Sequence, residues 1–141
     1  MFAGPGGIYT QDNPHFFWDD LNNRLGIGTN TPVTSIDNVG FTKLGDQAPN
    51  IKVKYFTGVT SNVQGGSVSF THGVSDAKII SITGLVDYGA NQYIHQGYTF
   101  NIGYNFNVYS DGSGNIVVAN VSGQSGNILT RFYRVYITYI E

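Results

Sequence analysis

One short stretch of the chain has the residue types of a hydrolase site, with His72 followed by Ser75 and Asp76. Serine hydrolases hold a serine, a histidine and an acid in hydrogen-bonded contact, beside backbone N–H groups that stabilise an oxyanion. The stretch lacks the Gly-x-Ser-x-Gly elbow that exposes such a serine on a tight turn. We therefore expect these residues to form a turn, and we predict that the protein is not an enzyme.

The pattern of possible metal ligands is also incomplete. The chain has no cysteine, and His15, His72 and His95 are not spaced as zinc ligands usually are. We expect the histidines in turns or at the surface, with no metal and no cofactor. The alternative is a metal held on a threefold axis, where one histidine from each of three chains would meet.

Acidic residues give two further weak patterns. Asp111, Ser113 and Asn115 alternate like the start of a calcium loop, but the distal glutamate that completes such a loop is missing. Asp19 and Asp20 are neighbours in sequence, whereas glycosidases need two carboxylates that face each other across a cleft. We expect solvated turns at both places, and a depolymerase is the least favoured of the functions considered.

A cluster of tyrosine and amide side chains has a chemistry suited to binding. Tyrosine offers a flat apolar ring with a polar end, and amides add donors and acceptors, a combination that suits sugars as well as protein interfaces. Packing within the core or at an interface is the ordinary alternative. The candidate ligand is a polysaccharide of the host surface. The candidate contacts for a glycan or receptor are Tyr88, Asn91, Gln92, Tyr93 and Tyr98.

Composition limits the class of protein. The 141 residues suit a single domain, and only 11% of them are charged, against about 25% in a typical soluble domain. The formal net charge is -2 without a run of Lys or Arg, which argues against nucleic acid as a partner. No apolar run approaches the roughly 20 residues of a membrane span, so we expect no membrane insertion.

The chain has two unequal parts. Residues 1–50 are rich in Gly, Pro, Asn and Asp and hold only short apolar clusters, so they cannot close a core without a partner surface. From residue 51 onward, β-branched and aromatic runs alternate with turn residues, which is typical of an all-β domain. We expect a loop at 88–97, a hairpin turn at 111–114, and strands at 51–60, 67–71, 78–87, 98–109, 115–122 and 131–140. Six strands at this spacing predict an antiparallel β-sandwich or jelly-roll-like domain.

Two of these strands carry apolar residues on both faces. Because side chains alternate along a strand, the last one has Tyr133, Val135, Ile137 and Tyr139 on one face and Phe132, Arg134, Tyr136, Thr138 and Ile140 on the other. The strand at 78–87 has Ile80, Ile82, Gly84 and Val86 on one face and Ile79 and Leu85 on the other. The outer face of a monomeric sandwich is normally polar, so this surplus predicts burial against another subunit.

The most informative stretch runs from Trp18 to Pro32 and reads WDDLNNRLGIGTNTP. Its residue types predict short strands at 16–18 and 24–27, joined by an Asp/Asn turn and ended by Pro32. Such a hairpin is marginal alone. It gains stability when three copies wrap around an axis and bury Trp18, Leu25 and Ile27 against one another.

This stretch resembles a short module of fibre, spike and appendage proteins of tailed bacteriophages, and it is similar to modules of some bacterial surface adhesins. Residues 58–82, with the runs GVT, GGSVSFTHG and KIISI, resemble the C-terminal β domain of comparable phage fibre proteins. The resemblance implies a homotrimeric, intertwined β shaft. Only one copy of the module is present, so we expect a short stub rather than a long fibre.

The resemblance leads to an expected organisation and location. We expect a structural protein on the exterior of the virion, a homotrimeric head or tail fibre or capsid decoration used in host attachment. Residues 1–17 are expected to be a flexible anchor that docks on a capsid or tail protein, 18–50 an intertwined β-hairpin stalk, and 51–141 a β-sandwich head. The predicted trimer-interface residues are Trp18, Leu25, Ile27, Phe132, Tyr136 and Ile140. A glycan-binding receptor-recognition tip and a bacterial surface adhesin module remain as alternatives.

Overall fold

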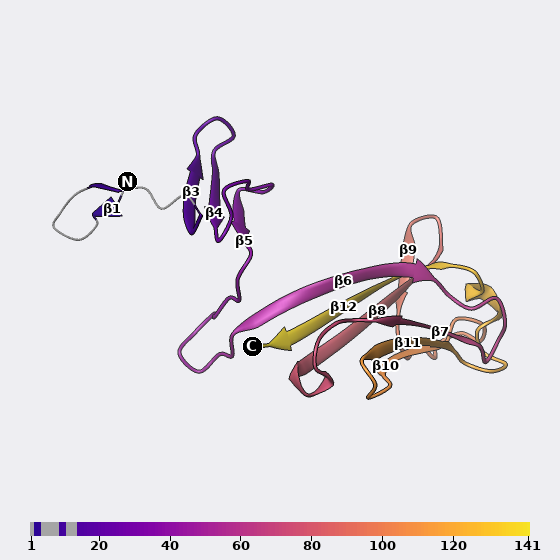
Figure 1. The fold of residues 1–141 in the computed structure, drawn as a ribbon. Coiled ribbons are helices and arrows are strands. Elements are labelled where there is room, and N and C mark those ends of the chain that lie inside the picture. Colours follow the sequence, from indigo (N-terminus) through magenta and orange to yellow (C-terminus); the bar gives the residue numbers. More distant parts are fainter. Residues whose placement is uncertain (1, 4–8, 11–13) are drawn as a thin grey trace. The chain divides into compact units, whose positions relative to one another are not determined.

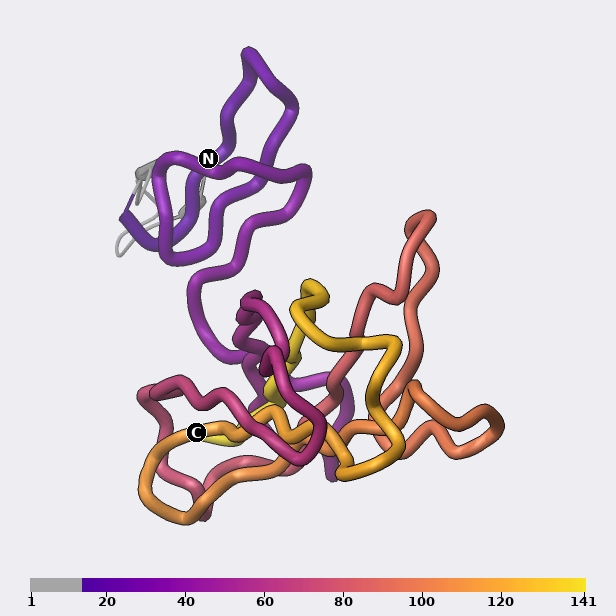
Figure 2. The backbone as a smooth tube through the Cα atoms, turned by 90° about the vertical axis from the view of Figure 1, so that its right-hand side faces the viewer, coloured from indigo at the N-terminus to yellow at the C-terminus, as the bar shows by residue number. Residues whose placement is uncertain are grey.

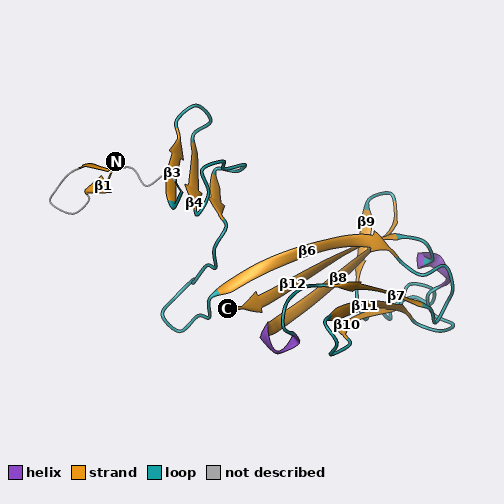
Figure 3. Cartoon of the chain, viewed as in Figure 1, coloured by secondary structure: helices purple, strands orange, loops and turns teal. Residues whose placement is uncertain are grey.

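The computed structural model describes residues 2–3, 9–10 and 14–141 of the chain (Figure 1). This part consists of strands and loops, with two short 3₁₀ turns at Asp76–Lys78 and Gly126–Ile128 (Figure 3). Nearly all of the strand pairs are antiparallel, so the predicted all-β fold is confirmed. The chain divides into two compact units, Met1–Asn50 and Ile51–Glu141.

The first unit consists of short strands. Their bounds are β1 (Phe2–Ala3), β2 (Tyr9–Thr10), β3 (Phe16–Asp19), β4 (Arg24–Ile27) and β5 (Ile36–Asn38). β1 pairs with β2, and β4 lies between antiparallel β3 and parallel β5. The β3–β4 hairpin follows the sequence prediction, which did not include β5. Of the flexible anchor predicted at 1–17, positions 1, 4–8 and 11–13 lie outside the described residues. β3 begins at Phe16, within the predicted range.

The turn between β3 and β4 has the chemistry expected from its sequence. The Asp19 carboxylate accepts hydrogen bonds from the side-chain amide of Asn22 at 2.8 Å and from its backbone N–H at 3.1 Å. These bonds, the side-chain one first, lower the pKa of Asp19. Asn23 has a φ of 54°, a conformation that asparagine tolerates better than most residues. The Asp/Asn turn therefore fixes the hairpin.

The second unit is a sandwich of two antiparallel sheets (Figure 1). One sheet has the strand order β6-β12-β8-β9 and the other β10-β11-β7. The bounds are β6 (Ile51–Val59), β7 (Ser67–Thr71), β8 (Ile79–Gly89), β9 (Gln92–His95), β10 (Phe106–Ser110), β11 (Asn115–Asn120) and β12 (Phe132–Ile140). Figure 2 shows the β8–β9 hairpin extending from the body of this unit.

Most of the predicted strands lie where the sequence placed them. β7 matches its prediction, and β6, β8, β11 and β12 agree to within two residues at each end. The strand predicted at 98–109 is wrong over its first two thirds, because β10 begins only at Phe106. The loop predicted at 88–97 is also wrong, since it contains β9 and a tight turn in which Gly89, Ala90 and Asn91 all have positive φ.

The core lies between the two sheets. Its fully or nearly buried apolar side chains are Val86, Ile94, Phe106, Val108, Ile116, Val118, Ile128, Tyr133, Val135 and Ile137. The face of β12 predicted to carry Tyr133, Val135 and Ile137 is the one that packs inward. On β8, Gly84 allows the sheets to approach closely, because a Cβ there would collide with Val108 of β10.

A β-bulge changes the faces predicted for the start of β8. The register between β8 and β12 shifts at Thr138 and Tyr139, where Tyr139 pairs with Ile79. Ile79 therefore packs against the core, while Ile80 is 53% exposed. The predicted grouping of Ile80 with Ile82 on one face is wrong, because strict alternation fails where a strand carries an extra residue.

Candidate functional site

The three-stranded sheet of the first unit has one apolar face. Residues paired across strands share a face, and the register places Trp18 opposite Leu25 and Phe16 opposite Ile27. Ile36 of β5 lies beside Leu25. Trp18 is 49% exposed and Ile36 67% exposed. The structure therefore gathers the predicted interface residues Trp18, Leu25 and Ile27 on one open surface, which we call the hairpin face together with Phe16 and Ile36.

The loop after β4 covers the opposite side of this sheet. Gly26 is buried there, and a Cβ on it would collide with the backbone carbonyl of Thr29. The Arg24 guanidinium donates a hydrogen bond of 3.0 Å to the carbonyl of Pro32, which is also buried. The arginine, glycine and proline of the Trp18–Pro32 module thus shape a loop on one side and leave the apolar side open.

Residues 14–50 fold without an apolar core. Among them only Gly26 and Pro32 are buried, and the buried hydrophobic side chains that form a core all belong to the second unit. The prediction that the N-terminal part cannot close a core is therefore confirmed for this stretch. A folded segment that exposes its apolar side chains is typical of an interaction surface.

The outer face of the four-stranded sheet is apolar at one end. Tyr136 lies opposite Tyr55, with ring centroids 5.0 Å apart, and Ile140 lies opposite Ile51. Val53, between these pairs on β6, is 59% exposed. We call these five residues the apolar stripe. It includes the predicted interface residues Tyr136 and Ile140, both of them half-buried.

The outer face of the three-stranded sheet is more polar. β7 contributes Ser67, Ser69 and Thr71 to it, and β10 contributes Asn107. Tyr109 is an exposed aromatic residue on this face, 49% open to solvent. The two outer faces of the sandwich therefore differ, and among the described residues a cluster of apolar residues like the apolar stripe is absent from the outer face of the three-stranded sheet.

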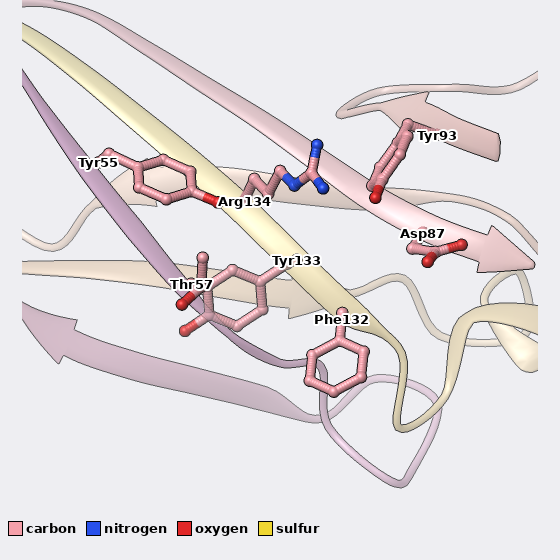
Figure 4. A pocket seen from close by; sticks show the side chains of 7 residues that line it. All are labelled: Tyr55, Thr57, Asp87, Tyr93, Phe132, Tyr133 and Arg134. Carbon is pink, nitrogen blue, oxygen red and sulfur yellow. The ribbon is translucent and has the colours of Figure 1, made fainter. Parts of the chain in front are cut away.

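A groove of about 300 Å³ lies next to the apolar stripe on the same sheet (Figure 4). Four strands line it with Tyr55, Thr57, Asp87, Tyr93, Phe132, Tyr133 and Arg134. Tyr55 belongs to both surfaces, at the border between them. The guanidinium carbon of Arg134 lies 4.3 Å from the centroid of the Tyr93 ring. Phe132, predicted as an interface residue, is 70% exposed and belongs to this groove rather than to the stripe.

The candidate glycan-contact residues do not form one site. A second hollow of about 100 Å³ is lined by Tyr88, Ile94, Tyr98, Asn101 and Tyr104. In it the ring of Tyr104 meets Tyr88 and Tyr98 edge to face, an ordinary aromatic packing arrangement. The predicted residues are thus divided among three places: Tyr88 and Tyr98 line this hollow, Tyr93 lines the groove, and Asn91 and Gln92 lie in the β8–β9 turn and at the start of β9.

His72 follows β7 in a turn, as expected, but it is buried rather than at the surface. Its Nε2 lies 3.4 Å from Oδ1 of Asp76. That oxygen accepts a hydrogen bond from the Ser110 hydroxyl, and Oδ2 of Asp76 accepts one from the Gly114 N–H at 3.1 Å. The bond from Ser110 is the main cause of a lowered pKa at Asp76. Ser110 rather than Ser75 contacts the acid, and the acid lies at the centre. A hydrolase triad has the histidine in that position.

The acidic loop at 111–115 is a structural turn. Asp111 accepts hydrogen bonds from the Asn115 amide at 2.9 Å and the Ser113 N–H at 2.8 Å, and these lower its pKa. The predicted hairpin between β10 and β11 is confirmed.

Within residues 14–141, no three His, Cys, Asp or Glu side chains converge as metal ligands, and His15 and His95 are exposed. The described residues include no helix long and apolar enough to span a membrane.

Comparisons with protein-family models, with curated proteins and with solved structures found no match. The functional argument therefore rests on this chain's own residues. Three surfaces carry it: the hairpin face, the apolar stripe and the groove.

Proposed function

We propose that the protein is a structural subunit on the exterior of a bacteriophage particle, a homotrimeric head or tail fibre or decoration protein. Its N-terminal segment docks on a capsid or tail protein, the following residues to about position 50 form a short stalk, and residues 51–141 form a head for attachment to the host surface. The class of protein and the threefold symmetry are supported by the resemblance of the Trp18–Pro32 module to phage fibre modules.

The folded but coreless stretch at 14–50 is the observation that carries this proposal. Burial of apolar surface contributes about 25 cal/mol per Å² and is the main favourable term in folding. A stretch whose only fully buried residues are a glycine and a proline gains little of this term by itself and must obtain more of it from a partner. The hairpin face lies on the side of the sheet that no loop within residues 14–50 covers, so copies of the same chain have access to it.

The apolar stripe supplies a second contact surface for the same assembly. Its five side chains are uncharged, so covering them requires no ion to leave water. Val53 and Tyr55 are each more than half exposed, and both lie on β6, one of the two edge strands of the sheet. Each unit of the chain therefore carries one apolar contact surface, and both surfaces can take part in the same trimer.

Light scattering coupled to size-exclusion chromatography tests the oligomeric state of the full chain. We expect a mass three times the 15.3 kDa of one chain. Val53→Glu places a carboxylate in the apolar stripe, at a position outside the groove, and should reduce the mass toward that of a monomer, because a buried unpaired charge is costly. Tyr109→Glu is the control, since Tyr109 is also about half exposed but lies on the opposite sheet, 49% against 59% for Val53.

Two results would contradict the assembly. One is a monomeric wild-type chain at micromolar concentration, and the other is an equal loss of mass in both glutamate variants.

The location is tested separately with a gold-labelled antibody against residues 51–141. Label on intact phage particles supports a virion subunit, whereas label on the bacterial envelope in the absence of phage identifies an adhesin module instead.

A further inference from the structure

The groove on the four-stranded sheet contains one cation, Arg134, and one carboxylate, Asp87, which are not joined by a salt bridge. Arg134 stacks on the Tyr93 ring, and none of the described carboxylates forms a salt bridge with it. Stacking occupies one face of the guanidinium plane and leaves the N–H donors at its edge available. Because these donors match the two oxygens of a carboxylate, the groove has a position prepared for an anionic group.

The remaining lining suits a ring that carries hydroxyl groups. Phe132 is 70% exposed and offers a flat apolar surface for the C–H face of a sugar. One oxygen of Asp87 accepts the Gly89 N–H at 2.8 Å, and the carboxylate retains acceptor capacity for hydroxyl donors. Thr57 adds a hydroxyl that can both donate and accept.

The size and position of the groove are consistent with a small ligand. Its volume of about 300 Å³ lies at the lower end of the range for ligand pockets, about 300–1,000 Å³, and suits one or two sugar units. Figure 4 shows Arg134 extending toward Tyr93, with Phe132 apart from both, so a ligand between them meets charge at one end and an aromatic ring at the other. The groove lies at the end of the sheet where β6 finishes and β12 begins, away from most of the apolar stripe.

We infer that this groove binds a carboxylated saccharide, such as a uronic acid unit of a surface polysaccharide. Arg134 pairs with the carboxylate, Asp87 accepts hydrogen bonds from ring hydroxyls, and Phe132 packs on the apolar face of the ring. This inference rests on the proposed function, because attachment to a host surface is the role that such a site would serve.

Paired probes test the charge requirement. Methyl β-D-glucuronide and methyl β-D-glucoside differ only in the carboxylate, and each is titrated into the ¹⁵N-labelled full chain while amide and Arg134 side-chain NMR signals are followed. We expect saturable shifts around the groove and an affinity roughly tenfold higher for the glucuronide, equivalent to about 1.4 kcal/mol. Arg134→Gln should remove this preference, and Phe132→Ala should weaken both probes.

Tyr109→Ala is the control, since it removes an exposed ring from the opposite sheet and should leave both affinities unchanged. Equal affinities of the wild-type chain for the two probes, no saturable binding of either, or binding that both groove variants retain would each overturn the inference. The mass of every sample is measured alongside. A trimer that binds neither probe refutes the saccharide site alone, whereas a monomeric wild-type chain refutes the assembly whatever it binds.

Discussion

Trp18→Ala should weaken self-association strongly and leave the second unit folded. A tryptophan buries up to about 250 Å² when it is enclosed, so the 49% of Trp18 that is exposed corresponds to roughly 120 Å² that a neighbouring copy can cover. At about 25 cal/mol per Å², and allowing for the methyl group that alanine keeps, the loss is about 2–3 kcal/mol per chain. That loss raises the dissociation constant about 30- to 150-fold for each chain affected.

The assay uses the fact that Trp18 is the only tryptophan of the chain. In a dilution series of the wild type, indole emission should move from the blue-shifted value of a buried ring to the value of a solvated one as the assembly dissociates. Light scattering on the same samples gives the mass. Trp18→Ala should dissociate at a much higher protein concentration than the wild type does.

Tyr109→Ala is the control here too, because Tyr109 is also an aromatic residue with 49% exposure, but it lies on the more polar outer face. Substitutions of exposed residues away from any interface usually change stability by less than about 0.5 kcal/mol. If Trp18 emits as a solvated indole at every concentration, or if both alanine variants keep the wild-type mass, the reasoning from the hairpin face is refuted.

Two further predictions concern the second unit. Thr60→Val should lower the free energy of unfolding by about 1–3 kcal/mol in urea melts, because the buried hydroxyl donates to the Ile128 carbonyl and accepts the Arg131 N–H. Thr57→Val, at an exposed position, is the control. Equal losses in both variants would contradict the role given to the Thr60 hydroxyl. Asp76→Asn should flatten the loss of stability in acid. Hydrogen bonds, first from a serine hydroxyl and then from a backbone N–H, lower the pKa of Asp76 below its ordinary 3.8. Its contribution is therefore present above that value and is lost as the pH falls through the lowered pKa. Unfolding curves between about pH 5 and 2 that are parallel in the variant and the wild type would count against the Asp76 cluster.

The sequence predicted well those elements whose residues carry a local signal. In β7 the polar and apolar residues alternate without interruption, and its ends match the prediction. The β10–β11 hairpin has glycines at Gly112 and Gly114, which take the positive φ that the turn requires. The β3–β4 hairpin was recognised from its Asp/Asn turn in the same way. In each case the deciding interactions lie within a few residues of one another.

The errors arose where distant contacts override local preference. The β8–β9 turn includes Ala90 at a φ of 51°. Alanine rarely adopts a positive φ, so its presence in the sequence does not predict this turn. The bulge that exposes Ile80 is imposed by pairing with β12. His72 is buried because its turn packs beneath the β10–β11 hairpin, whose Ser110 and Gly114 bond to the neighbouring Asp76. No property of the isolated segments reveals these contacts.

The groove was only partly visible in the sequence for the same reason. Alternation along β12 placed Arg134 on the same face as Phe132, and Tyr93 was already a binding candidate. Asp87 was missed, as was the proximity of Arg134 to Tyr93. Both depend on β12 lying between β6 and β8, with β9 beyond, a sheet order that brings together residues more than forty positions apart in the chain.

The position of charge on the four-stranded sheet separates assembly from ligand binding. Arg134 and Asp87 both belong to the groove, and covering them with an apolar surface would remove two ions from water without pairing them, at a cost of several kcal/mol each. The apolar stripe has no such cost. Copies of the chain are therefore expected to contact one another through the apolar stripe and not through the groove. Phe132 lies at the charged end, so its exposed ring suits a ligand that also pairs with Arg134 better than it suits a second copy of the sheet.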